Sequence, residues 1–305
     1  MSAVPRAIPL DDAWDEVLAL LALHWPGLPE IVARARDYGT DWRALSRPFG
    51  VRVGGQLVAH AGVWALPTMV VDGKESRVAG IHAVCTRAEL RKRGYARAAL
   101  EAAIAHAETI ASRQLLFAVE PRVYTSVGFR RTSPQRFELG LTRTLDGEAT
   151  LRRLDLDDAS ERARLRALCR DRVRLSDRLC VVDGGALLIL DELLGTRGHG
   201  GRLWWVDDKT IVAAELLEDE LHIYDLVCTE PRPLAELARA WPGRFRRIVV
   251  YFDAAALELG AALEPYTEPG DRLRPRPVLG GDLPMLRGDA SSAEAGFSLS
   301  PLATC

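Results

Sequence analysis

The sequence predicts an α/β protein of two domains, and three observations lead to this fold class. The chain has 305 residues, more than one hydrophobic core usually accommodates. Segments with strand composition alternate with segments whose apolar residues recur at helical spacing. The order of these segments in the first half returns in the second half, after a turn-rich boundary near residues 144–147. We therefore expect domains at residues 1–145 and 146–305, the second ending in a tail.

The first domain is expected to begin with two helices and a hairpin. Asp11 and Asp12 can cap the first helix, and Gly54-Gly55 supplies the hairpin turn. The elements expected here, in chain order, are helices at 13–23 and 28–38, strands at 49–53, 56–66 and 78–86, a helix at 96–111, a strand at 114–120, a short helix after Pro121 and a final strand at 135–141.

The second domain is expected to repeat this order. Its expected elements are helices at 157–170 and 186–194, strands at 202–206, 209–215 and 220–227, a helix at 233–241, a strand at 244–252 and a helix at 254–263. The tail after Gly270 is rich in Pro and Gly. The sequence leaves open whether this tail pairs at a sheet edge or wraps around the domains.

Charge and hydropathy exclude several functional classes. The chain has 40 basic and 42 acidic residues and a formal net charge of -2. This balance gives no electrostatic reason to expect binding to nucleic acid or to an anionic membrane. No apolar run approaches the length of a membrane span, and the N-terminus lacks the apolar core of a signal peptide. We expect a cytoplasmic protein with an ordinary core, since 48% of its residues are hydrophobic.

The five cysteines are scattered along the chain and form no CxxC pair. Neither a structural zinc site nor a disulfide framework is therefore supported, and no metal is expected. Cys85 lies within the strand expected at 78–86, where a small core residue is the simpler interpretation than a nucleophile.

The stretch 78–106 carries the strongest functional signal. It reads as a buried strand, a basic loop with one glycine, and an amphipathic helix. The first N–H groups of a helix have no partner within it, and the helix dipole is positive at this end. Gly94 allows a tight turn and a close ligand, and Arg91 to Arg93 add three positive charges. A phosphate or pyrophosphate suits this junction.

The loop matches neither the P-loop nor the dinucleotide-binding glycine pattern. It does match Arg/Gln-x-x-Gly-x-Gly/Ala, through Arg91, Gly94 and Ala96. In these residues the chain resembles the acetyl-CoA pyrophosphate loop of the GNAT superfamily of N-acetyltransferases. Other readings of the six residues exist, since a basic, solvated helix start has the same composition.

A second motif lies downstream in the order that the GNAT family has it. Tyr124, Gly128 and Phe129 match the Tyr-x-x-x-Gly-Phe signature of the family's short helix and last strand. The resemblance covers roughly residues 5–143. It implies a mixed, mostly antiparallel central sheet flanked by helices, and the second half resembles a second GNAT-like domain in tandem.

The second half departs from the pattern where its own cofactor loop should lie. Residues 228–233 contain no glycine, and Pro231 and Pro233 remove backbone donors that could hold phosphate. We expect a degenerate domain that binds no cofactor. The first half also resembles Eis-type aminoglycoside acetyltransferases, in its Leu-Pro-Thr segment at 66–68 and its acid-x-x-x-Tyr approach to Gly-Phe. Those enzymes have a third domain and use their terminal carboxylate, so a role for Cys305 is left open.

The resemblance implies which residues hold acetyl-CoA, the expected cosubstrate. The pantetheine arm lies against backbone groups of the key strand, where an N–H can polarise the thioester carbonyl. The pyrophosphate lies on the loop that opens the following helix. The matching residues here are Ala83, Val84 and Cys85 on the strand, and Arg91, Lys92, Arg93, Gly94, Tyr95 and Ala96 on the loop.

Three side chains are candidates for proton transfer. Tyr124 matches the family's general acid, which protonates the leaving thiolate; its alternative is a packed aromatic with a bonded hydroxyl. His82 has an ordinary pKa that suits deprotonation of an amine, unless it is a hydrogen-bonded core histidine. Glu120 could bind the incoming ammonium or take its proton, or it could be a solvated strand end. The proton could also leave through water, with no dedicated base.

We therefore expect an N-acetyltransferase that transfers acetyl directly from acetyl-CoA to a primary amine, with a small-molecule acceptor. The alternative is a non-catalytic acyl-CoA-binding sensor or scaffold, because an intact cofactor loop suits both. Trp25 and Trp64 could line the acceptor pocket or pack in the core. No nucleic acid or membrane partner is expected, and the sequence leaves open the acceptor, the acyl length and whether the protein is a monomer or a homodimer.

Overall fold

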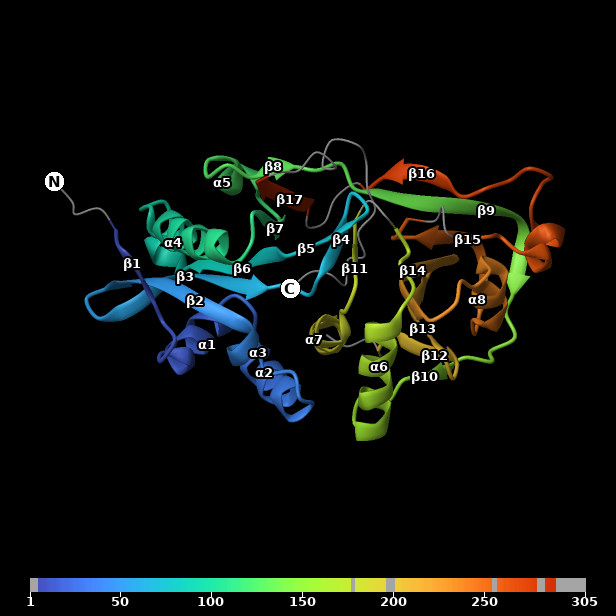
Figure 1. The fold of residues 1–305 in the computed structure, drawn as a ribbon, viewed down its shortest axis with the longest axis horizontal. Helices are drawn as coiled ribbons and strands as arrows, with labels where there is room; N and C mark the ends of the chain where they lie inside the picture. Colours follow the sequence, from blue (N-terminus) through green and yellow to red (C-terminus); the bar gives the residue numbers. More distant parts are fainter. Residues whose placement is uncertain (1–4, 177–178, 196–200, 254–256, 279–282, 289–305) are drawn as a thin grey trace.

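The computed structural model describes residues 5–176, 179–195, 201–253, 257–278 and 283–288. Within these ranges, two seven-stranded sheets with flanking helices lie side by side along the long axis of the molecule (Figure 1). A three-stranded sheet, β11-β4-β5, joins the two halves. The α/β class is confirmed, with one GNAT-like sheet in each half.

The first sheet has the strand order β1-β2-β3-β6-β7-β17-β8 within the described residues. Only β6 and β7 pair in parallel, so the sheet is mixed and mostly antiparallel. Helix α4 packs on one face through its alanine-rich side, and α1 and α2 pack on the other. Its elements are β1 (Ala7–Pro9), α1 (Trp14–Ala22), α2 (Leu28–Asp37), α3 (Trp42–Leu45), β2 (Ser46–Val53), β3 (Gln56–Ala65), β4 (Met69–Val71), β5 (Lys74–Ser76), β6 (Val78–Thr86), η1 (Ala88–Leu90), α4 (Tyr95–Ile110), β7 (Arg113–Ala118), α5 (Pro121–Thr125) and β8 (Arg130–Arg131).

The second sheet has the order β10-β12-β13-β14-β15-β9-β16, and its parallel pair is β14 with β15. The same antiparallel-then-parallel pattern thus occurs in both halves. Its elements are β9 (Gln135–Asp146), β10 (Arg152–Arg153), α6 (Ala159–Asp171), β11 (Leu179–Val181), α7 (Gly185–Gly195), β12 (Leu203–Asp207), β13 (Thr210–Leu217), β14 (Glu220–Cys228), α8 (Leu234–Ala240), β15 (Arg244–Val250), η3 (Ala261–Tyr266), β16 (Arg274–Pro277) and β17 (Leu283–Gly288).

Each sheet takes a strand from the other half of the sequence. The strand expected as the last of the first sheet forms as β9, but it pairs with β15 and β16 in the second sheet. Strand β17, from the tail, pairs with β7 and β8 in the first sheet. Met285 of β17 is fully buried in the core under α4. The tail therefore pairs within a sheet over the residues described here.

Four local features differ from the sequence-based expectation. Helix α1 begins after Ala13, which makes no side-chain cap, so neither Asp11 nor Asp12 caps it. Strand β2 begins at Ser46 rather than residue 49, and the short helix α3 before it was not expected. The helix expected at 254–263 does not form over residues 257–260, where a short 3-10 turn follows instead; its first residues, 254–256, lie outside the described chain.

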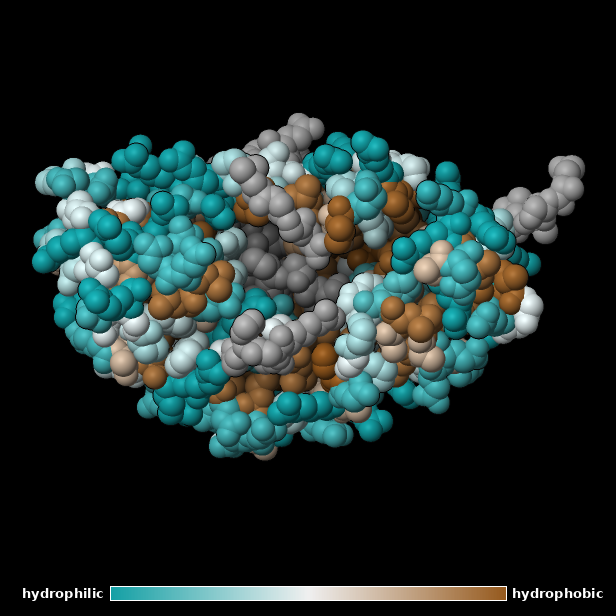
Figure 2. All heavy atoms as spheres, turned by 180° about the vertical axis from the view of Figure 1, so that it is seen from behind, coloured by the Kyte–Doolittle hydropathy of each residue, from teal (hydrophilic) through white to brown (hydrophobic). Residues whose placement is uncertain are grey.

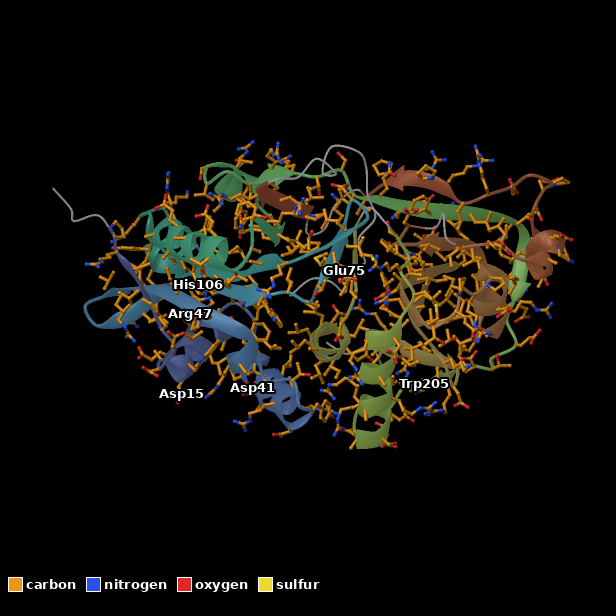
Figure 3. All side chains as sticks on the ribbon, in the orientation of Figure 1. Asp15, Asp41, Arg47, Glu75, His106 and Trp205 are labelled. Atoms are coloured by element: carbon orange, nitrogen blue, oxygen red, sulfur yellow. The ribbon has the colours of Figure 1, made fainter. Side chains whose placement is uncertain are left out.

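The two halves share one hydrophobic core. A single buried cluster joins α1, α2 and Trp64 of the first half to α6, α7 and Trp205 of the second. Ion pairs also link the two halves: Arg34 binds Asp157 at 3.0 Å, and Glu75 of β5 pairs with Arg174 (Figure 3). On the face shown in Figure 2, hydrophilic residues cover most of the periphery. The buried junction makes the halves one packed body.

In the second half, a segment of the chain fills the gap where β14 and β15 separate. The strands pair in parallel only as far as Ile223 and Val250. Beyond that point, Arg172 binds the Asp225 carboxylate, with nitrogen–oxygen distances of 2.5 and 3.1 Å, and the Val173 N–H donates to the Cys228 carbonyl at 2.8 Å. On the β15 side, the Ser176 hydroxyl donates to Asp253. Residues 172–176 therefore bridge the two strands.

Candidate active site

The corresponding gap in the first half lies beside a bulge in β6. The parallel pairing of β6 with β7 ends at Gly80 and Leu115. On its other side, β6 has two residues, Ala83 and Val84, where β3 has only Ala61. Ala83 has a φ of 50°, and neither neighbouring strand pairs with it or with Val84. The bulge thus turns half-buried backbone toward the gap.

A helix N-terminus faces the same gap. Gly94 precedes α4 with a φ of 84°, and Lys92 also has a positive φ, of 62°. The first intrahelical bond runs from the Ala98 N–H to the Gly94 carbonyl, which leaves the N–H groups of residues 95–97 without helical partners. The first turn contains no acidic side chain. Together with Arg91, this arrangement suits an anion.

One cavity of about 680 Å³ connects these elements. The strand, the loop and the helix start form one part of it, the end of β7 and α5 form a second, and α2, α3 and α7 close a third. Of the twelve residues predicted for the site, eleven line this cavity: His82, Ala83, Val84, Cys85, Arg91, Lys92, Gly94, Tyr95, Ala96, Glu120 and Tyr124. Arg93 does not line it.

Tyr124 and Glu120 lie on the β7 and α5 side. Tyr124 is half-buried, and its ring packs edge-on against Phe129, with centroids 6.4 Å apart. Its carbonyl accepts the N–H groups of Val127 and Phe129, which ties the helix to the start of β8. Glu120 is exposed at the start of α5, and its carbonyl accepts the Val123 N–H at 3.3 Å. Its carboxylate makes no hydrogen bond or ion pair with any described residue. The structure therefore brings a phenol and a carboxylate to one wall.

His82 is in the cavity wall but is not an ordinary titrating base. It is 4% exposed, packs against Trp42 and Trp64, and its Nε2 lies 2.7 Å from the Ser46 hydroxyl oxygen. Burial, and to a lesser extent neighbouring His60, lowers the pKa of His82 to about 3. Of the two alternatives that the sequence leaves open for His82, its burial and its hydrogen bond with Ser46 favour the hydrogen-bonded core histidine.

Neighbouring His60 secures the bulge. Its Nδ1–H donates to the Ala83 carbonyl at 2.8 Å, and burial lowers the pKa of His60 to about 4. Cys85 is 7% exposed, and burial raises the pKa of its thiol to about 12. Cys85 is therefore protonated at neutral pH and poorly suited to act as a nucleophile.

Four buried polar atoms in the cavity wall have no hydrogen-bond partner among the described residues. They are His24 Nε2, Trp42 Nε1, His82 Nδ1 and Thr86 Oγ1. Buried polar groups are nearly always paired, so an unpaired group in a cavity wall points to a ligand or water there. Of these residues the sequence indicated only His82. His24, Trp42 and Thr86 carried no motif, because their neighbours in the fold are distant in the chain.

Of the two tryptophans that the sequence suggested for the acceptor pocket, one lines the cavity and the other lies in the core. Trp25 lines the cavity from the link between α1 and α2. Trp64 is 2% exposed and lies in the shared core, not in the cavity wall. Leu194, from α7 of the second half, does line the cavity and was not anticipated. Cys305 lies outside the described residues.

The comparisons with known proteins agree with this geometry. Residues 6–132 match the family model described as acetyltransferase (GNAT) domain. This range contains the bulged strand, the basic loop, α4, and both Tyr124 and Phe129. No curated protein matches the sequence.

Solved structures share the fold of nearly the whole chain at low sequence identity. A probable N-acyltransferase from Enterococcus faecalis V583 is 15% identical, with a TM-score of 0.61 over 93% of this chain and 72% of its own. Eis1 from Mycobacterium abscessus is 16% identical, with a TM-score of 0.56 over 93% and 73%. A GCN5-related N-acetyltransferase from Kribbella flavida is 18% identical, with a TM-score of 0.54 over 95% and 74%. The two halves together therefore share a fold with these solved structures.

No group of three His, Cys, Asp or Glu side chains gathers within the described residues in a way that could bind a metal ion. No helix in the described part of the chain is long and apolar enough to span a membrane. The four cysteines in the described ranges are free thiols.

Proposed function

We propose that the protein is an acetyl-CoA-dependent N-acetyltransferase that transfers acetyl directly to a primary amine of a small molecule. One observation carries this proposal: a single cavity joins an unpaired strand bulge, a basic helix N-terminus and Tyr124. Each element alone is common. Their combination serves the two ends of an acyl-CoA and leaves a separate space for an acceptor.

The residues in the cavity wall suit acetyl-CoA. When bound, acetyl-CoA supplies an acetyl group activated as a thioester. The backbone of Ala83, Val84 and Cys85 is available at the bulge, and the N-terminus of α4 with Arg91 and Lys92 suits a pyrophosphate. Arg93, which lies outside the cavity wall, contributes positive charge to the same loop. The protonated thiol of Cys85 favours direct transfer over an acyl-enzyme.

Three side chains have further roles in the proposed reaction. We assign to the Tyr124 hydroxyl the proton that the leaving thiolate takes up. Glu120, a carboxylate with no ion pair among the described residues, orients the ammonium of the acceptor. His82 stays neutral at physiological pH, so in this proposal it acts as a hydrogen-bonding group and not as the general base. Water then carries the amine proton away from the site.

The second half serves as a supporting domain in this proposal. Its strand gap corresponds to the one beside the β6 bulge, but residues 172–176 fill it with backbone and side-chain bonds. The loop before α8 has no glycine and contains Pro231 and Pro233. Residues 1–145 are thus the active half in this proposal. Residues 146–305 contribute α7 to the cavity wall of the active half.

A thermal shift with acetyl-CoA tests the cofactor site. At one hundred times its dissociation constant, a ligand adds about 2.7 kcal/mol of stability, or about 4 °C for a chain of this length. Gly94→Glu places a carboxylate at the anion site and should abolish this shift. Gly55→Glu is the matched control, since Gly55 has the same φ of 84° at an open hairpin turn. Loss of the shift in both variants, or in neither, would contradict the assignment.

Turnover separates the enzyme from the sensor or scaffold. Tyr124→Phe should reduce thiol release from acetyl-CoA with an amine by about 10²-fold or more, while the acetyl-CoA thermal shift stays unchanged. Tyr266→Phe, in the second half and outside the cavity wall, should leave both readouts unchanged. Acetyl-CoA binding with no thiol release in the wild type, across a broad set of amines, would favour the sensor.

A further inference from the structure

The charged residues of the cavity are distributed unevenly. Its cationic side chains, Arg91, Lys92 and Arg97, all belong to the loop and helix start that suit the cofactor. The other two parts of the cavity, formed by β7 with α5 and by α2, α3 and α7, are here together called the acceptor end. Their described residues supply a single carboxylate, Glu120. His24 and His82, which also line the cavity, have lowered pKa values and are neutral at physiological pH. Within the described part of the chain, the acceptor end therefore offers one negative charge.

Most of the other side chains at the acceptor end are large and apolar, although Trp42 Nε1 and the Tyr124 hydroxyl are polar. Trp25, Leu28 and Trp42 contribute from the helical layer of the first half, and Phe117 from the end of β7. Val119 and Val123 lie close to Glu120 in the chain, line the cavity and are 84% and 42% exposed. Such walls stabilise an apolar body by burial, at about 25 cal/mol per Å² of apolar surface.

The second half supplies part of this wall. Leu194 lies near the end of α7, and α7 is anchored in the core that the two halves share. Glu192 fixes the neighbouring chain, since its carboxylate accepts the Arg202 N–H at 2.9 Å. The apolar surface at Leu194 is thus held in place by the second half and is available only in the intact protein.

We propose that the acceptor is a primary amine with one positive charge on an aromatic or aliphatic body, and that Glu120 and Leu194 determine this specificity. This inference rests on the proposed function and narrows its substrate class. A polyamine or an aminoglycoside carries several ammonium groups, and each would need a carboxylate or water in place of the apolar wall. One carboxylate among apolar side chains selects a monoamine.

Direct binding tests the inference without requiring turnover. Isothermal titration of the full chain, saturated with CoA, would compare phenethylamine with 2-phenylethanol, spermidine and kanamycin. Phenethylamine should bind at least about tenfold more tightly than spermidine or kanamycin. The alcohol has the same body without the charge, so the ratio of amine to alcohol affinity measures the contribution of Glu120.

Two variants, each with a matched control, test whether Glu120 and Leu194 contribute to acceptor binding. Glu120→Gln should lower the amine-to-alcohol ratio about threefold to fivefold, whereas Glu30→Gln, an exposed carboxylate of α2 outside the cavity wall, should not. Leu194→Ala should weaken phenethylamine and 2-phenylethanol equally, by about threefold to tenfold. Leu217→Ala, at an exposed leucine of β13, should change neither.

The outcomes separate this inference from the proposed function. Spermidine or kanamycin binding as tightly as phenethylamine would overturn it, as would failure of phenethylamine to bind the CoA-saturated protein. An unchanged ratio in Glu120→Gln would remove Glu120 from specificity. Binding of phenethylamine with no acetyl transfer to it or to any amine of the broad set would instead contradict the N-acetyltransferase, while the binding specificity would stand.

Discussion

At the scale of single residues, burial decides the protonation of the two histidines beside the bulge. His60 and His82 are 1% and 4% exposed, and their pKa values fall to about 4 and about 3. Each exists in the folded protein as a neutral ring held by one hydrogen bond, His60 to the Ala83 carbonyl and His82 to Ser46. The unfolded chain protonates both near pH 6.5.

This difference predicts a pH-dependent stability. A depressed folded pKa means that stability is complete above the unfolded pKa, near 6.5, and is lost as the pH falls toward about 3, since only the unfolded state binds the proton in that window. Between pH 7 and pH 5, His82 should account for a loss of about 2 kcal/mol. His82→Gln should remove that part of the slope in urea unfolding measured at both pH values.

The partly exposed His106 of α4 serves as the control (Figure 3). Its pKa is also lowered by burial, but less completely, so His106→Gln should flatten the slope by a smaller amount. If the two variants flatten the slope equally, or if His82→Gln leaves it unchanged, His82 is not the buried neutral group described above.

Comparison of the cofactor loop with His82 shows which properties of the site the sequence could predict. Gly94 and Arg91 were predicted because their role depends on local order along the chain: a strand, a turn and a helix start. The protonation of His82 depends on Ser46, Trp42 and Trp64, which lie 36, 40 and 18 residues away. Periodicity places a residue on a strand, but it does not report what covers that strand.

At the scale of elements, the molecule contains the same pair of separating parallel strands twice, with different contents. In the first half, β6 and β7 open onto the cavity; in the second, β14 and β15 enclose residues 172–176. Arg172 and Asp225 are both nearly inaccessible, with side-chain exposures of 6% and 9%. Their ion pair is therefore shielded from water and depends on both partners.

Removal of one partner should strongly destabilise the protein. Asp225→Ala leaves the Arg172 guanidinium buried without its counter-charge, which should lower the free energy of unfolding by about 3–5 kcal/mol. The exposed pair of Arg164 and Asp208, with Asp208 95% exposed, is the comparison; Asp208→Ala should cost about 1 kcal/mol or less. Denaturant unfolding of both variants measures the difference. Equal losses would mean that residues 172–176 contribute little to holding β14 and β15.

Most elements were predictable, but two pairings were not. Strand composition and turn residues located β3, β6, β13 and β14 within a few residues, because these strands are defined by local pattern. The pattern of β9 predicts a strand equally well, but not its sheet. That choice depends on which edge is open, and β17 occupies the place beside β7.

At the scale of the whole molecule, the exchange of strands and the shared core tie the halves together. The first sheet contains β17 from the end of the described chain, and β11 of the second half pairs with β4 of the first. The cavity itself takes Leu194 from α7. The division at residues 145 and 146, which stays a prediction as a domain boundary, would cut through all three contacts.

A chain cut at residue 145 should therefore not form a stable acetyl-CoA site. It would lack Met285, whose fully buried side chain packs with Leu116 and Phe129, and it would leave β7 with an open edge. We expect residues 1–145 to unfold without a cooperative transition and to show no shift with acetyl-CoA, whereas the full chain shows one transition and the shift. In the full chain, Met285→Ala should lower the stability by about 2–5 kcal/mol, and Leu217→Ala should not. A cooperative, acetyl-CoA-responsive fragment would show that the first half is complete without β17, and the second half would then matter only for the acceptor wall at Leu194.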